Sequence, residues 1–362
     1  ISSFSTGEYQ IIYGADSDDF IISDTGILSE YTGSHTAITD TKTINNIPVT
    51  KIGGDCFAGS NIEYIELPET VTEIGYQAFA QSNLYEIKAP GIETILGYAF
   101  YECHHLYKEY MPNVTIASEQ AFGYCYSLNS ISFAKNIKSL GNRCFISTGL
   151  ETVNLPELTS INCSFEENYL KTAYLPKITH LNGGFYDCVY LEELYIPNVT
   201  KISNSAIGYC ERLKGFPFDN ITEVGNNGFG MCMFDEIILP NCTKLTGSVF
   251  NSVFSKYISI PLVTQIPVHS FSDPNLEYVS MDNVENFRTT NYIFTDVFSL
   301  KGLYLPKAIN IPTFDWDSYG ERIIAEGLQL PLEYIYAPKA TTFNFEKSQM
   351  QYFDKMQFIF AP

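Results

Sequence analysis

The sequence has 362 residues, of which 45% are hydrophobic and only 17% are charged. Its formal net charge of −20 argues against binding to nucleic acid or to an anionic membrane surface, because both require clustered Lys and Arg. The charge indicates solubility first, and a basic or cation-assisted partner second. No apolar run is long enough to span a membrane, and the chain begins at Ile1 without a leader, as expected of a mature or trimmed protein.

Residues 1–48 are predicted to form a β-rich N-terminal cap and lead-in. The acidic run from Asp16 to Asp19 lies in this part, and a second acidic pair, Asp315 and Asp317, lies near the other end. Carboxylates can bind Ca²⁺, but neither group follows the D-x-[DN]-x-[DN]-G loop. We therefore predict no metal site and no cofactor.

Residues 49–300 are predicted to be regular repeats of 20–23 residues, because two markers recur in register. Stacked repeats share a core that no single repeat can bury alone, so this pattern predicts a solenoid. The first marker is a phenylalanine, replaced once by isoleucine: Phe57, Phe79, Phe100, Phe122, Phe145, Phe165, Phe185, Ile207, Phe229, Phe250 and Phe271. The second is a proline slot: Pro68, Pro90, Pro112, Ala134, Pro156, Pro176, Pro197, Asp219, Pro240, Pro261 and Asp282.

Each repeat is predicted to contain one short strand that ends at the proline slot. Apolar residues one and three positions before the slot, such as Ile65 and Leu67, alternate as one face of a strand does. Stretches such as Gly97–Phe100 are too short for an independent helix, so we expect one helical or 3₁₀ turn held by its Phe. The predicted fold is an α/β-type leucine-rich-repeat solenoid, a right-handed superhelix with one long parallel β-sheet and short helical or 3₁₀ turns opposite.

Some repeats are expected to be irregular. Pro217 falls inside the segment Gly215–Phe218, where a strand is expected, so local distortion is predicted there. The phenylalanine marker is not recognised after Phe271, and residues 301–362 are predicted to be divergent C-terminal repeats. An insert around Trp316 is expected to bulge from the solenoid.

The repeat resembles a known family. The segments Val71-Thr-Glu-Ile-Gly75-Tyr-Gln-Ala-Phe79 and Ala121-Phe122-Gly-Tyr-Cys125-Tyr-Ser-Leu128 are similar to the BspA-like, Treponema-type leucine-rich repeat, and residues 26–53 resemble the lead-in of such proteins. The resemblance is strong over residues 26–300 and weak over 301–362. It implies a secreted or surface-anchored protein, commonly of host-associated anaerobic bacteria, with adhesion or protein binding as the usual role.

Cysteine and asparagine recur at fixed slots. There are nine Cys, an odd number, and five of them lie three residues after the Phe marker: Cys103, Cys125, Cys188, Cys210 and Cys232. No pair has zinc-ligand spacing, so we expect these thiols to line the core. Asn-x-Thr motifs begin at Asn113, Asn198, Asn220 and Asn241. Their repeated slot predicts turn chemistry, with each Asn bonding its own backbone, before glycosylation. His104 and His105 are expected in a surface loop.

The residues two and four positions before the proline slot should point outward and form the displayed face. At the N-terminal end this face pairs Glu66 with Lys88 and Glu86 with Lys108, and its middle is small and polar. Exposed Tyr suits protein or glycan recognition, and is also simply β-prone. The candidate ligand-binding residues are Tyr174, Tyr195, Tyr257, Tyr278, Tyr304, Tyr334 and Tyr336, with Phe358 and Phe360 continuing the aromatic face.

These observations favour a non-catalytic surface or secreted module that binds an extracellular protein or a glycan through its sheet. One alternative is a structural spacer within a larger surface protein. Another is a glycan-acting enzyme, which would need two carboxylates close together in a cleft. The displayed carboxylates are Glu66, Glu86, Glu193 and Glu236, and an open sheet excludes water poorly.

Overall fold

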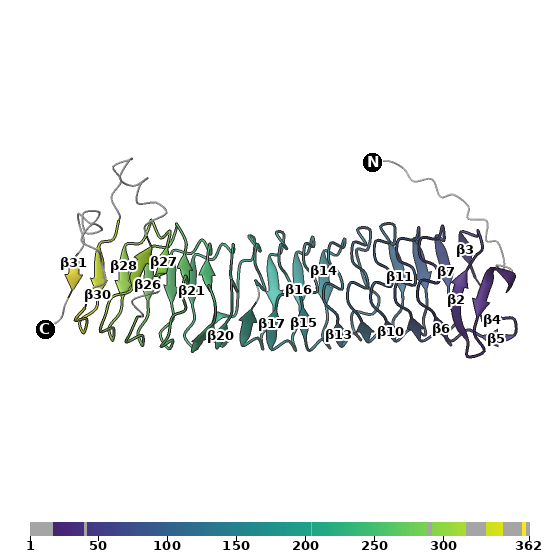
Figure 1. Cartoon of the computed structure of the whole chain (residues 1–362), viewed down its shortest axis with the longest axis horizontal. Helices are drawn as coiled ribbons and strands as arrows, with labels where there is room; N and C mark the ends of the chain where they lie inside the picture. Colours follow the sequence, from purple (N-terminus) through teal and green to yellow (C-terminus); the bar gives the residue numbers. More distant parts are fainter. Residues whose placement is uncertain are drawn as a thin grey trace. The chain divides into compact units, whose positions relative to one another are not determined.

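The computed structural model describes residues 17–39, 42–203, 205–287, 292–315, 331–342 and 357–359. The chain divides into two compact units, Ile1–Glu151 (unit 1) and Thr152–Pro362 (unit 2). In both units, short strands of successive coils lie side by side (Figure 1). The Asp16 and Asp317 carboxylates, the insert around Trp316 and Phe360 lie outside the described residues. The division of the sequence at residues 48 and 300 stays a prediction.

In unit 1, each coil contributes strands to two sheets. The sheet whose repeat strands end shortly before the proline slot is called the front sheet, and the other is called the back sheet. The front sheet has the order β11-β9-β7-β3, with β3 (Ala37–Ile38), β7 (Tyr64–Glu66), β9 (Glu86–Lys88) and β11 (Lys108–Tyr110). The back sheet contains β1 (Phe20–Ile22), β2 (Ile27–Tyr31), β6 (Lys51–Ile52), β8 (Glu73–Ile74), β10 (Thr94–Ile95), β12 (Ile116–Ala117) and β13 (Ser139–Leu140). Within these two sheets, only the β1–β2 pair is antiparallel. Outside them, unit 1 contains the η1 turn (Ser17–Asp19) and a hairpin of β4 (Thr43–Ile44) and β5 (Ile47–Pro48).

In unit 2, the front sheet is split. One part contains β14 (Thr152–Asn154), β16 (Thr172–Tyr174) and β18 (Glu193–Tyr195); the other contains β21 (Glu236–Ile238), β24 (Tyr257–Ser259), β26 (Tyr278–Ser280), β28 (Gly302–Tyr304), β30 (Tyr334–Tyr336) and β31 (Gln357–Ile359). The back sheet contains β15 (Ile161–Asn162), β17 (His180–Asn182), β19 (Lys201–Ser203), β20 (Glu223–Val224) and β22 (Lys244–Leu245). A further ladder contains β23 (Phe250–Asn251), β25 (Phe271–Ser272), β27 (Tyr292–Thr295) and β29 (Thr313–Asp315).

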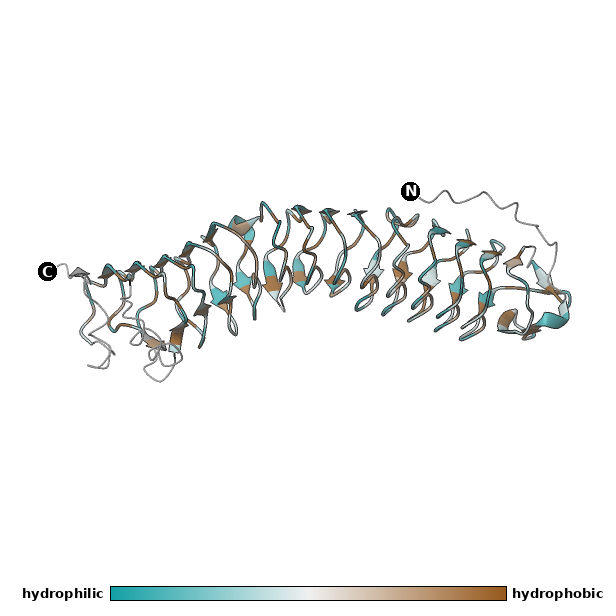
Figure 2. Cartoon of the chain, turned by 90° about the horizontal axis from the view of Figure 1, so that it is seen from above, coloured by the Kyte–Doolittle hydropathy of each residue, from teal (hydrophilic) through white to brown (hydrophobic). Residues whose placement is uncertain are grey.

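The predicted repeat solenoid with parallel strands is therefore confirmed, and the marker phenylalanines form its core. Apolar and polar segments alternate along each coil (Figure 2). In unit 1 the marker rings stack at centroid distances of 4.9–5.3 Å, from Phe57 to Phe145. The sequence analysis expected the phenylalanine marker to end at Phe271. In unit 2, however, the stack continues beyond Phe271. Phe294 and Phe314 continue it, each 4.9 Å from the preceding ring.

The predicted helical turn at the marker is wrong in detail. Among the described residues there is no α-helix, and the only 3₁₀ turns are η1 and η2 (Phe218–Asn220). In the stretch around Phe79, the amide of Ala80 donates to the Gln77 carbonyl of its own coil, whereas the amides of Phe79 and Gln81 donate to the next coil. Because Gln77 and Gln81 have φ values of 55° and 58°, the backbone cannot continue as a helix. The turn is thus another ladder between coils.

A buried carboxylate interrupts the front sheet of unit 1. Glu109 lies where the neighbouring coils have Ile65 and Ile87, and it is 7% exposed. Its carboxylate accepts hydrogen bonds from the backbone amide and the hydroxyl of Ser132 and from the Met111 amide. Because the Ser132 amide donates to this carboxylate, it is not available for a backbone ladder, and residues 130–132 form no strand beside β11. Burial raises the pKa of Glu109, and these hydrogen bonds oppose that rise.

Side chains at fixed slots also bond from coil to coil. The five slot thiols are buried, as predicted, and each donates to the marker carbonyl of the coil before it, such as Cys125 to Phe100 at 3.0 Å. The prediction for the recurring Asn was right about the turn position and wrong about the hydrogen-bond acceptor. The Asn198 side-chain amide donates not to its own backbone but to the Pro176 carbonyl one coil earlier, at 2.7 Å. His104 and His105 are exposed, as predicted.

Candidate functional site

The front sheet of unit 2 presents two outward columns of side chains. In each of its strands from β14 to β30, the middle residue is buried, and the flanking residues are exposed or half-buried except Ser280 of β26 and Gly302 of β28, which are buried. Register aligns the first column as Glu236, Tyr257, Tyr278, Gly302 and Tyr334. The outward orientation predicted from positions two and four before the proline slot is therefore found in these strands.

The structure separates the predicted tyrosines into two groups. Tyr174 and Tyr195, on β16 and β18, stack at 4.6 Å with their rings 2° from parallel. They are 40% and 50% exposed. The other group, called the tyrosine cluster, lies on β24, β26, β28 and β30 and comprises Tyr257, Tyr278, Tyr304, Tyr334 and Tyr336.

A glycine shapes the tyrosine cluster. Tyr304 and Tyr336 stack at 4.9 Å, whereas Tyr278 and Tyr334 lie 6.5 Å apart in a tilted arrangement across Gly302. A Cβ added to Gly302 would lie 2.5 Å from Cζ of Tyr334, so the Tyr334 ring occupies the space above the glycine. Burial raises the pKa of Tyr334, and the nearby Tyr278 and Tyr257 add to the rise.

Charged and polar groups border the cluster. The residues just before its strands alternate in charge, as Lys256, Glu277, Lys301 and Glu333, and Lys301 lies 2.6 Å from Glu277. On the other border, Ser280 forms a hydrogen bond of 2.7 Å with Asp282. An aromatic centre with a polar rim is the usual arrangement of a protein-binding surface. The cluster has that arrangement on an open face.

The displayed carboxylates are dispersed. Glu86 pairs with Lys108 at 3.1 Å, as predicted, and Glu66 neighbours Lys88 in the strand register. Glu66 also accepts a 3.1 Å hydrogen bond from Tyr64. In the described part of the chain, no group of His, Cys, Asp and Glu is placed to hold a metal ion. No helix there is long and apolar enough to cross a membrane.

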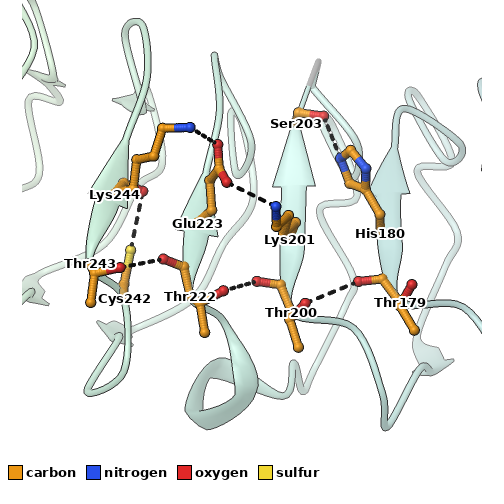
Figure 3. Close-up of polar contacts among 10 residues, drawn as sticks. All are labelled: Thr179, His180, Thr200, Lys201, Ser203, Thr222, Glu223, Cys242, Thr243 and Lys244. Atoms are coloured by element: carbon orange, nitrogen blue, oxygen red, sulfur yellow. Dashed lines mark hydrogen bonds and ion pairs between the residues drawn. The ribbon is translucent and has the colours of Figure 1, made fainter.

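The sequence analysis missed the polar back sheet of unit 2. Glu223 lies between Lys201 at 3.3 Å and Lys244 at 2.5 Å, and the Lys244 hydrogen bond is the main reason that the pKa of Glu223 is lowered (Figure 3). Below this row, threonine hydroxyls donate to the carbonyls of the preceding coil, as Thr222 does to Thr200 at 3.2 Å. These contacts tie successive coils together, which is a stabilising role. The alternating Lys and Glu of this column were the available signal.

A second aromatic surface was also missed. In unit 1, rings on the turn stretches touch in sequence, at 5.4–6.2 Å: Tyr76, Tyr98, Tyr101, Tyr124 and Tyr126. Their side chains do not belong to the front sheet. The signal was the enrichment in Tyr next to the marker Phe, which the sequence analysis assigned only to the strands.

The architecture of stacked short coils around a phenylalanine core defines a leucine-rich-repeat solenoid. Residues 50–171 and 180–311 match the BspA type leucine rich repeat region, in six copies. The chain therefore belongs to the BspA-type leucine-rich repeat family, which confirms the resemblance seen in the sequence.

Solved structures of bacterial leucine-rich repeat proteins are similar. One from Bacteroides ovatus is 20% identical with a TM-score of 0.59, covering 93% of this chain and 85% of that one. The Treponema pallidum leucine-rich repeat protein is 23% identical with a TM-score of 0.40, covering 55% and 90%. A leucine rich cell surface protein from Faecalibacterium prausnitzii is 17% identical with a TM-score of 0.38, covering 92% and 94%. The first of these supports the fold, and no curated protein matches the sequence.

Proposed function

We propose that this chain is a non-catalytic binding module of a secreted or cell-surface bacterial protein, and that it binds an extracellular protein or glycan through the front sheet of unit 2. The observation that carries the proposal is the tyrosine cluster, where stacked rings stand on an open sheet within a polar rim. Tyrosine offers a large, rigid contact area at low entropic cost. Membership of a repeat family with a binding or structural role supports the same function.

The first test is a binding screen of the purified chain against extracellular-matrix proteins and a glycan array. The test variant replaces Tyr257, Tyr278 and Tyr304 together with Ala. Hot-spot aromatic residues often contribute a factor of ten or more each, so affinity should fall by at least roughly tenfold. The three residues are exposed or half-buried, so the variant should fold normally, which circular dichroism would check.

A matched control replaces three exposed tyrosines of unit 1, Tyr85, Tyr107 and Tyr126, which are 44%, 46% and 55% exposed. This control should keep full affinity, because its residues lie off the front sheet of unit 2. A ligand that binds the wild type and the cluster variant equally would remove the cluster from the site. If neither panel yields a saturable ligand, the spacer role becomes the better account.

A further inference from the structure

The back sheet of unit 2 ends at β22, although the chain continues into further coils. Up to this strand each coil donates to the one before it, as the Thr246 amide does to the Val224 carbonyl at 2.9 Å. Pro267 takes the place of Thr246 in the next coil, and it has no amide hydrogen to donate. The front sheet is interrupted in a comparable way at Pro217, where residues 214–217 form no strand.

Segment 264–268, which contains Pro267, is therefore not tied to its neighbours by a ladder. Among the described residues, no backbone hydrogen bond joins it to β22 or to residues 285–287. The threonine hydroxyls that donate to the preceding coil form a series as far as Thr243, and Thr264 does not continue it (Figure 3). The segment thus stands apart from the coils on either side of it at the back of unit 2.

A cavity lies where segment 264–268 leaves the ladder. Its volume is about 640 Å³, which is within the range of sites that hold small ligands. Leu245, Phe287 and Ile293 line it and are buried, so they form its inner wall. Pro267 and Val268 line it closer to solvent, and Val268 is 40% exposed. The cavity therefore has an apolar wall that a ligand can contact.

Neutral polar side chains surround this apolar wall. Counted from the proline slot, the back-sheet column that contains Lys244 continues with Gln265 and then with Asn286, so charged side chains give way to amides. Both amides are exposed and line the cavity, and neither makes a hydrogen bond or an ion pair with a described residue. Among the lining residues, all of which belong to the described part of the chain, Glu285 alone carries a charge.

These groups fit a neutral ligand that is rich in hydroxyl groups. A side-chain amide can donate to one hydroxyl and accept from its neighbour, while the C–H face of a sugar ring can pack on Pro267 and Val268. Because no Lys or Arg lines the cavity, an anionic ligand would find no opposite charge there. Glycoside hydrolysis needs a pair of carboxylates, and Glu285 is one, so the arrangement favours binding without cleavage.

We propose that this cavity is a second binding site of the chain and that it binds a neutral saccharide. Gln265 and Asn286 would hydrogen-bond the hydroxyl groups, and the apolar wall would contact the ring. The proposal goes beyond the proposed function, because the cavity is lined by the end of the back sheet and by the coils that follow it, and it shares no residue with the tyrosine cluster.

The test is saturation-transfer difference NMR of the full chain with a panel of neutral, acidic and amino mono- and oligosaccharides. The variant Val268→Trp places an indole in the cavity. Its matched control is Leu262→Trp, on the same coil at 42% exposure but outside the cavity. A neutral saccharide should bind the wild type and the control, and should bind Val268→Trp at least roughly tenfold more weakly. Circular dichroism would check that both variants fold.

Two milder variants test the amides without filling the cavity. Gln265→Ala and Asn286→Ala change exposed side chains, and each should weaken binding by roughly twofold to tenfold, which is the usual contribution of a neutral hydrogen bond. Binding of acidic or amino sugars alone, equal loss in Val268→Trp and Leu262→Trp, or no binding across the panel would overturn the proposal.

The tyrosine-cluster variant separates this site from the front sheet. The variant with Tyr257, Tyr278 and Tyr304 replaced by Ala should bind the saccharide as the wild type does, because none of the three lines the cavity. A saccharide that is lost in this variant but kept by Val268→Trp would belong to the front sheet. That result would support the proposed function and refute the cavity site.

Discussion

The stacked phenylalanines of unit 1 make the cohesion between neighbouring coils measurable. Phe79 and Phe100 lie 5.3 Å apart with their rings 7° from parallel, and both are fully buried. Replacing either with Leu keeps an apolar side chain but leaves a small void, which should lower the free energy of unfolding by about 1–2 kcal/mol. Either single replacement already removes the contact between the two rings, and the double replacement cannot remove it a second time. The losses of the two single variants should therefore not add up to the loss of the double variant.

The expected coupling between Phe79 and Phe100 is about 0.5–1.5 kcal/mol, the usual range for an aromatic pair. The control pair is Phe57 and Phe100, which are separated by the Phe79 ring and lie two coils apart. Its effects should add to within about 0.3–0.5 kcal/mol.

Native-state hydrogen exchange of unit 1 amides is the assay, because it reports local opening free energies in a repeat protein that need not unfold as one unit. Equal coupling in the Phe79–Phe100 and Phe57–Phe100 pairs would mean that the void, and not ring contact, determines the loss. Zero coupling in both would refute the view that the stacked rings hold neighbouring coils together.

Three further outcomes are expected. In Gly302→Ala, the new Cβ would displace the Tyr334 ring, while the unfolding free energy changes by less than about 1 kcal/mol; the NMR shift of a fluorinated tyrosine would show the movement. Because burial raises the pKa of Glu109, its contribution to stability is complete below the unfolded value of about 4.3 and is lost as pH rises through the folded pKa. Glu109→Gln should flatten that dependence in urea titrations between mild acid and neutrality, and an unchanged slope would contradict it. Cys125, being buried, should react with a thiol reagent only as fast as unit 1 opens, and a fast native reaction would contradict its placement.

Local alternation made much of the fold predictable. Apolar residues at fixed distances before the proline slot, such as Ile65 and Leu67, could only face inward if the segment was a strand. The thiol slot was predictable for the same reason. Phe294 and Phe314 follow the marker at steps within the range of the earlier repeats, so the sequence contained the signal, and the search for the marker stopped too early.

Contacts between coils were not predictable in the same way. The Asn198 amide and the Phe79 backbone amide bond to a neighbouring coil, and that choice depends on the register between coils, which the pattern within one repeat does not contain. Glu109 at an inward position was visible in the sequence, but only the structure shows that Ser132 satisfies it. In the candidate site, the outward columns were correct, while the split of the tyrosines followed from Gly302 and Pro217.

The interrupted front sheet can persist because each coil is held by more than one ladder. A backbone group left without a partner costs about 1–3 kcal/mol when it is buried, and far less when water can reach it. The coil around Pro217 keeps its back-sheet and turn hydrogen bonds, and Phe216 and Phe218 anchor it to the core. Loss of the front strand therefore does not detach the coil, whose Lys214 amide still donates to the Glu192 carbonyl. A solenoid held by a single sheet would lose its main contact between coils at such an interruption, so the other ladders are what permits the front sheet to lose a strand at Pro217.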